Sequence, residues 1–144
     1  MKTALMLSVL GLLLVAATPA ISADKHQTPN APAEFQSKKN PIEFDELDEK
    51  AVKSVERLYG GKCKKCHGEE GGGDGTAAAD MLIKPTAFNA PGYAAKRSDG
   101  QLFWITLNGS PNTEMKGFGP GTDNNLSEQE IWKLVAFIKN RFAK

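Results

Sequence analysis

The sequence gathers its most reactive side chains into one short stretch, Cys63-Lys64-Lys65-Cys66-His67. The chain has only two cysteines and two histidines, and three of these four residues lie within five positions. A Cys-x-x-Cys-His pattern is the attachment signature of haem c. Its spacing places both sulfurs along one edge of the macrocycle, where each can form a thioether bond, and the histidine can coordinate the iron. We therefore expect one covalent haem c, bound through Cys63, Cys66 and His67.

Two other chemistries also use closely spaced cysteines. A thioredoxin-like redox pair needs the motif beside a strand–helix–strand unit, and no segment here shows the sustained alternation of a strand. A structural zinc site normally has four Cys or His ligands, whereas the fourth candidate, His26, lies far from the motif. Haem attachment is favoured, and a thiol oxidoreductase stays open as an alternative.

The first 23 residues have the layout of a secretory signal peptide. Lys2 precedes an uncharged run over 4–17 that is short for a membrane span, and small residues up to Ala23 provide a processing site. Cleavage there predicts a periplasmic protein, while a signal retained as an anchor is the alternative. Residues 24–43 are polar, rich in proline and without apolar periodicity, so we expect a flexible leader before a domain over 44–144.

Composition limits what else the chain can be. At 144 residues, with 40% hydrophobic and 24% charged residues, it can form one small globular domain. Without the signal, basic and acidic side chains are equal in number, so no basic excess points to nucleic acid. The glycines at 71–75 lack the GxxxxGK[ST] pattern of a phosphate loop.

Helical periodicity and capping signals indicate an all-α fold. Three stretches carry apolar stripes at helical spacing, over about 45–59, 98–109 and 127–142. Each opens on a residue that can cap a helix, Asp45 in the first and serines in the other two. Residues 68–96 form a long irregular connection, which is unusual in a small domain unless a group other than protein packs against it. We therefore expect haem to complete the core, and the domain to be largely unfolded without it.

These features resemble class I c-type cytochromes over about residues 47–142. Besides the motif, the matching features are a tyrosine four positions before the first cysteine, a glycine-rich loop after the histidine, a methionine before the last helix, and the closing residues Leu126, Trp132, Leu134 and Phe137. The resemblance implies a cytochrome c fold of three to five helices around one haem, with the first and last helices crossing. Val55 stands where a small residue usually lies at that crossing, and Lys116 stands where proline often follows the ligand methionine.

The resemblance also implies His/Met ligation of the iron, with Met115 opposite His67. His26 and Met81 are the other candidates for the sixth ligand. Holding His26 on the iron would cost the ordering entropy of a long leader, and Met81 is expected to pack on the His67 side. A core-filling role for Met115 is the alternative. Pro85 is a candidate to accept a hydrogen bond from the second nitrogen of His67 through its carbonyl, with a plain turn proline as the equal alternative.

The function implied by the resemblance is one-electron transfer without enzymatic activity. The protein would be a carrier, or the electron-transfer haem subunit of a respiratory or oxidoreductase complex, including a membrane-associated one, and would exchange electrons with redox partner proteins. Four lysines could ring the haem edge and steer an acidic partner, or could simply form a solvated lysine face, which is the favoured alternative: Lys62, Lys64, Lys65 and Lys116. A haem enzyme or gas sensor with a labile sixth ligand is the alternative, supported only by Lys116.

Overall fold

The computed structural model describes residues 28–143, so the predicted signal peptide and His26 lie outside the described residues. The helices are α1 (Ala33–Gln36), α2 (Glu49–Lys62), α3 (Lys64–His67), α4 (Tyr93–Lys96), α5 (Asp99–Asn108) and α6 (Glu128–Arg141), with 3₁₀ turns η1 (Phe44–Glu46) and η2 (Ala78–Asp80). Over this range there is no strand beyond one isolated bridge, which confirms the all-α prediction. Of the six helices within residues 28–143, α1, α3 and α4 are single turns of four residues, and the three longer helices agree with the three to five expected.

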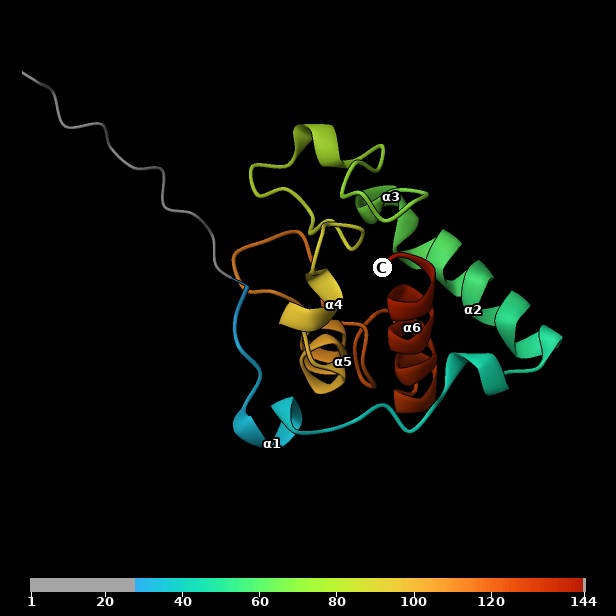
Figure 1. Ribbon diagram of the computed structural model, residues 1–144. Helices are drawn as coiled ribbons and strands as arrows, with labels where there is room; N and C mark the ends of the chain where they lie inside the picture. The colour runs from blue at the N-terminus through green and yellow to red at the C-terminus, as the bar shows by residue number, and fades with distance from the viewer. Residues whose placement is uncertain (1–27, 144) are drawn as a thin grey trace, which may run out of the picture.

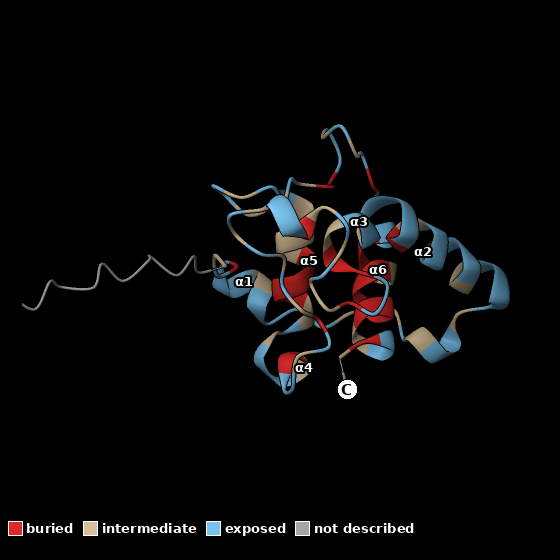
Figure 2. Cartoon of the chain, turned by 90° about the horizontal axis from the view of Figure 1, so that it is seen from above, coloured by how far each residue is buried: buried red, intermediate tan, exposed pale blue. Residues whose placement is uncertain are grey.

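Helix α6 lies at the centre of the domain, between α2 and α5 (Figure 1). Its side chains Ile131, Leu134 and Val135 are almost completely buried, and the Trp132 ring stacks on Phe103 of α5 at 4.0 Å. The helix begins as its sequence predicts, because Ser127 and Glu130 form a reciprocal capping box. Burial is concentrated on α5, α6 and the facing side of α2 (Figure 2).

Helix α2 begins three residues later than predicted. Asp48 is its N-cap and accepts the Ala51 N–H at 2.7 Å, whereas Asp45 lies in the preceding 3₁₀ turn. Both aspartates can cap, and the extended conformation of Leu47 separates the turn from the helix. Val55, 1% exposed, occupies the position where a small residue was expected, and the contact between α2 and α6 accommodates it.

Residues 28–43, which we call the N-terminal strap, lie against α5 and α6 although this segment was predicted to be a flexible leader (Figure 1). The buried Gln101 side chain accepts the Ala31 N–H at 2.7 Å and donates to the Pro29 carbonyl at 3.0 Å. Asn40 donates to the Trp132 carbonyl at 2.9 Å. The strap is thus held by isolated anchors that leave no periodic pattern in the sequence.

Among the described residues, no helix combines the length and the apolar character needed to cross a bilayer. The three long helices form one side of the domain, and the irregular segment between η2 and α4 extends over the other (Figure 1).

Candidate functional site

A cavity of about 270 Å³ opens between the irregular segment and the helical core. It is lined by residues from α3, α5 and α6, and from the loops around Met81 and Met115. Each predicted site residue lines it: Cys63, Cys66, His67 and Met115. The rest of the lining is mainly apolar and includes Phe88, Ile105, Phe118, Leu134 and Ile138.

The two cysteines are placed by a tight turn at the junction of α2 and α3. Cys63 ends α2, and its carbonyl accepts the Cys66 N–H at 3.1 Å and the His67 N–H at 2.9 Å. Both cysteine residues are half-buried, and neither forms a disulfide. Burial, followed by the nearby Cys66, raises the pKa of the Cys63 thiol to about 12. A reactive dithiol needs a thiol with a lowered pKa, so this environment does not favour a thiol oxidoreductase.

The His67 ring is buried and fixed on two sides. Its Nδ1–H donates to the Thr86 carbonyl at 3.0 Å, and the ring stacks on Phe88 with 4.3 Å between centroids. Burial lowers the pKa of His67, and the hydrogen bond to Thr86 opposes this only in part. The imidazole is therefore favoured in its neutral form with the Nε2 lone pair unused, which is the form that binds a metal.

Thr86, not Pro85, supplies the carbonyl that orients His67, so the prediction was wrong by one residue. Pro85 lines the cavity beside it. A proline can be located in a sequence, but the choice between adjacent carbonyls depends on the local rotation of the backbone. The loop is anchored on the far side by the Phe88 N–H, which donates to the Gly71 carbonyl at 2.6 Å.

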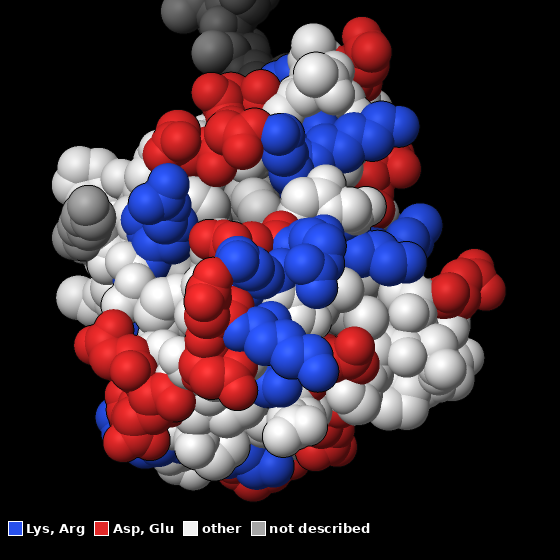
Figure 3. Space-filling view, turned by 90° about the vertical axis from the view of Figure 1, so that its right-hand side faces the viewer, with Lys and Arg blue, Asp and Glu red and all other residues white. Residues whose placement is uncertain are grey.

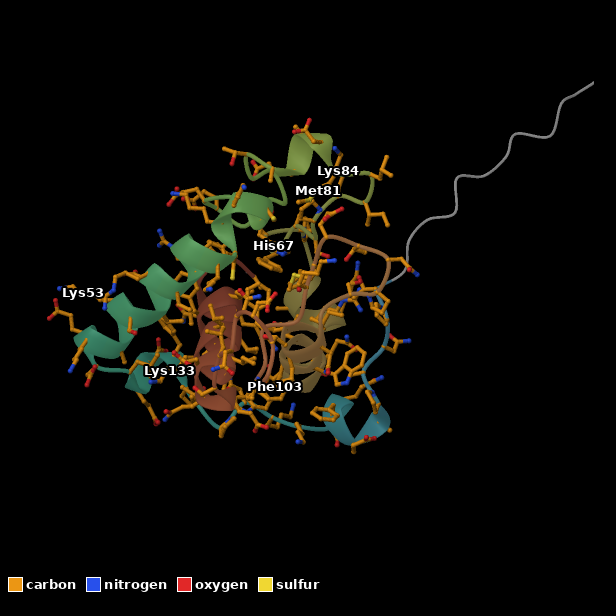
Figure 4. The ribbon with its side chains drawn as sticks, turned by 180° about the vertical axis from the view of Figure 1, so that it is seen from behind. Lys53, His67, Met81, Lys84, Phe103 and Lys133 are labelled. Carbon is orange, nitrogen blue, oxygen red and sulfur yellow. The ribbon has the colours of Figure 1, made fainter. Side chains whose placement is uncertain are left out.

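Two thioethers line the same cavity. Met115 is half-buried, packs against the hydrophobic core and lies in the loop between α5 and α6. Met81 lies next to Lys84 at the η2 end of the irregular segment, at the same end of the domain as His67, whereas Phe103 is at the opposite end (Figure 4). Both methionines therefore remain candidates for the sixth ligand, because both line the cavity that contains His67.

Tyr59 links α2 to the segment that follows the motif. Its hydroxyl donates to the Gly68 carbonyl at 2.8 Å, directly after His67. Burial raises the pKa of this hydroxyl, and negative charge on neighbouring acidic side chains raises it further. The tyrosine thus remains a protonated donor and holds the turn of the motif against α2.

The sequence matches the Cytochrome c family over residues 52–141. The chain is a member of the cytochrome c family. Its all-α structure is the cytochrome c fold, and one covalently attached haem c is its cofactor. The comparison with curated proteins gave no match.

Among solved structures, this cytochrome is similar to a chain of the reducing HAO-like protein complex of Kuenenia stuttgartiensis, with 30% identity and a TM-score of 0.49. The similarity covers 69% of this cytochrome and 44% of that chain, so the cytochrome spans less than half the length of its structural neighbour.

The residues around the cavity fit a covalent haem c. Two thiols and a neutral imidazole with an unused nitrogen lie close together where α2 meets α3, and apolar side chains of α5 and α6 line the same cavity. Cys63 and Cys66 would bond the macrocycle, while His67 and a thioether could coordinate the iron. Bound there, haem supplies reversible one-electron oxidation and reduction.

Sequence reasoning overlooked Thr86, Phe88 and the anchoring role of Gln101. Phe88 left a weak signal, since it is one of only two aromatic residues in the segment 68–96, which is rich in Gly, Ala and Pro, and a large aromatic side chain there is expected to pack against the core. Thr86 acts through its backbone and Gln101 through contacts with a distant strap, so neither leaves a local pattern.

Proposed function

We propose that this cytochrome c is a periplasmic one-electron carrier, or the electron-transfer haem subunit of a respiratory or oxidoreductase complex. In this proposal Cys63 and Cys66 would carry the haem, and His67 and Met115 would hold its iron, as the resemblance to class I members implies. One observation supports it above all: two thiols, a neutral imidazole and the Met115 thioether line a single apolar cavity.

With His67 and Met115 both holding the iron, no position would be left for a substrate, so the chemistry would be electron exchange without enzymatic activity. A methionine ligand favours the reduced state and raises the potential. The protein contributes a fixed His67 ring and an apolar lining that excludes water.

The redox partner is proposed to present an acidic surface, because lysines dominate the charge of the cavity lining. Lys62, Lys84 and Lys116 line it with a single acid, Glu114. Of the other two lysines predicted there, Lys64 pairs with Glu69, and neither it nor Lys65 lines the cavity. On the face of the domain that contains α2, basic and acidic side chains alternate instead (Figure 3). Electron exchange with an acidic partner should therefore slow as salt is raised.

The periplasmic location rests on the signal-like sequence of residues 1–23. Expression of the full chain in a bacterium able to attach haem c tests it. The expected product is a periplasmic haem protein whose mature N-terminus is Asp24, with one haem by mass spectrometry. A cytoplasmic or colourless product would overturn this part of the proposal.

The two methionines provide a matched test of the ligation. Met115→Leu should remove the weak far-red charge-transfer band that the oxidised protein shows with a methionine ligand, and should let the reduced protein bind carbon monoxide. Met81→Leu, in the same cavity, should do neither. The opposite pattern would assign the ligand to Met81, and ready carbon monoxide binding by the unchanged protein would favour the gas sensor or haem enzyme.

A further inference from the structure

The loop that carries Met115 has no proline after the methionine, yet it is closed at its base. Gly109 and Lys116 form an antiparallel bridge, and the Ser110 N–H donates to the Met115 carbonyl at 2.8 Å. Gly109 has a φ of 81°, and a Cβ there would lie 2.6 Å from the Met115 carbonyl oxygen. Only glycine allows the two arms to approach this closely.

Within the closed loop, the Thr113 hydroxyl makes two hydrogen bonds. It donates to the Ser110 carbonyl at 2.7 Å and accepts the Met115 N–H at 3.1 Å. Ser110 and Thr113 are the ends of a four-residue turn. Pro111 and Asn112 are its two central residues, and Asn112 has a φ of 60°. Proline followed by a residue of positive φ is the signature of a type II turn.

The hydroxyl therefore connects this turn to the backbone of the methionine. A side chain that accepts the N–H two residues on holds the backbone in a local turn, as Asx and ST turns do. Without it, the Met115 N–H would lose this partner, and the segment from Thr113 to Met115 would keep the bridge at the base of the loop and the backbone hydrogen bond from the Thr113 N–H to the Ser110 carbonyl at 3.3 Å.

We propose that Thr113 is the positioning residue for Met115. Its hydroxyl fixes the backbone from which the thioether reaches the cavity, and supplies the rigidity that a proline after the ligand would otherwise give. This inference rests on the proposed function, in which Met115 is the sixth ligand.

Thr122 offers a matched control. Its hydroxyl makes the same kind of pair, donating to the Gly119 carbonyl at 2.7 Å and accepting the Asn125 N–H at 3.2 Å, but it does not line the cavity. Replacement of either threonine by valine keeps the side-chain shape and removes both hydrogen bonds.

The experiment compares holoproteins of Thr113→Val, Thr113→Ser, Thr122→Val and Met115→Leu. The readouts are the far-red band, the midpoint potential and the fraction of reduced protein that binds carbon monoxide at neutral pH. Thr113→Val should raise that fraction about five- to tenfold, as expected for the loss of the two hydrogen bonds of the Thr113 hydroxyl, and should weaken the band. Thr113→Ser, which keeps the hydroxyl, should restore both, and Thr122→Val should match the unchanged protein.

The outcomes separate the inference from its premise. If Met115→Leu keeps the band and still excludes carbon monoxide, the proposed ligation fails. If Met115→Leu loses the band while Thr113→Val behaves like Thr122→Val, the role of Thr113 is overturned and the ligation stands. If Thr113→Val yields no folded holoprotein, Thr113→Ala against Thr113→Ser applies the same criteria.

Discussion

The two sides of the cavity are stabilised in different ways. On the α6 side, apolar side chains interlock, and Leu134 and Val135 are 1% and 0% exposed. On the side of residues 68–92, single backbone hydrogen bonds hold the chain, such as Gly73 N–H to the His67 carbonyl at 2.8 Å and Ala77 N–H to the Lys65 carbonyl at 2.9 Å. One side depends on side-chain volume, whereas the other depends on backbone conformation and on the cofactor it encloses.

The largest effect is expected when the cofactor is removed. In a Cys63→Ala, Cys66→Ala double variant the irregular segment would face an empty apolar cavity, so the domain should lose its cooperative thermal transition and much of its helical circular dichroism. Native-like helicity with a cooperative melt would show that the packing of α2, α5 and α6 is sufficient to fold the domain without haem.

A leucine on each side provides the next test. Leu134→Ala removes a fully buried side chain at the contact with the cavity and should lower the free energy of unfolding by about 2–5 kcal/mol. Leu82→Ala removes a side chain that is 101% exposed in the irregular segment and should change stability by no more than about 0.5 kcal/mol. Denaturant unfolding of the two holoproteins measures both, and equal losses would contradict the contrast.

Glycine-to-alanine replacements should change the stability of the fold in opposite directions on the two sides. Gly73 has a φ of 73°, and a Cβ would lie 2.4 Å from the Pro85 carbonyl oxygen, so Gly73→Ala should destabilise by more than about 1 kcal/mol. Gly60 is exposed within α2 with nothing within 4 Å of the added Cβ, so Gly60→Ala should stabilise by about 0.5–1 kcal/mol. Thermal melts measure the direction of both changes. A Gly73→Ala variant that is more stable than the unchanged protein would contradict the dependence of the 68–92 side on backbone conformation.

A pH-dependent effect is expected from an ion pair within the helical side. Burial opposes ionisation of Asp99, but hydrogen bonds from Lys139 and the Asn40 N–H outweigh it, so the pKa of Asp99 is lowered. A lowered pKa stabilises the fold above the ordinary value of about 4, and this stabilisation is lost as pH falls through the native pKa. Asp99→Asn should therefore cost about 1 kcal/mol at pH 7 and progressively less in acid, as measured by urea unfolding across pH. If the difference in unfolding free energy between the unchanged protein and Asp99→Asn were the same at all pH values, ionisation of Asp99 would not contribute to stability.

The parts predicted correctly from sequence were those with a repeating or fixed spacing. The α5 and α6 caps followed from Ser98 and Ser127, and the all-α fold from apolar periodicity. Cys63, Cys66 and His67 line one cavity, as the motif predicts, because haem attachment requires this fixed spacing and the spacing can be read directly from the sequence. The roles of these residues and of Met115 remain predictions for the experiments above.

The features that sequence reasoning missed depend on contacts between distant segments. Gln101 anchors a strap some seventy positions away, and Thr86 orients His67 through its carbonyl, which any residue type provides. Asp45 and Asp48 are equivalent as caps in sequence, and only the path of the chain at Leu47 distinguishes them.

The course of the N-terminal strap has a practical consequence for anyone who modifies this protein. Thr28, its first residue, lines the cavity. An affinity tag, fluorophore or surface linker joined just ahead of it would emerge beside the cavity that the haem would occupy. Immobilisation on an electrode through that end would thus turn the haem towards the metal, and a bulky fusion there would shield it from other proteins.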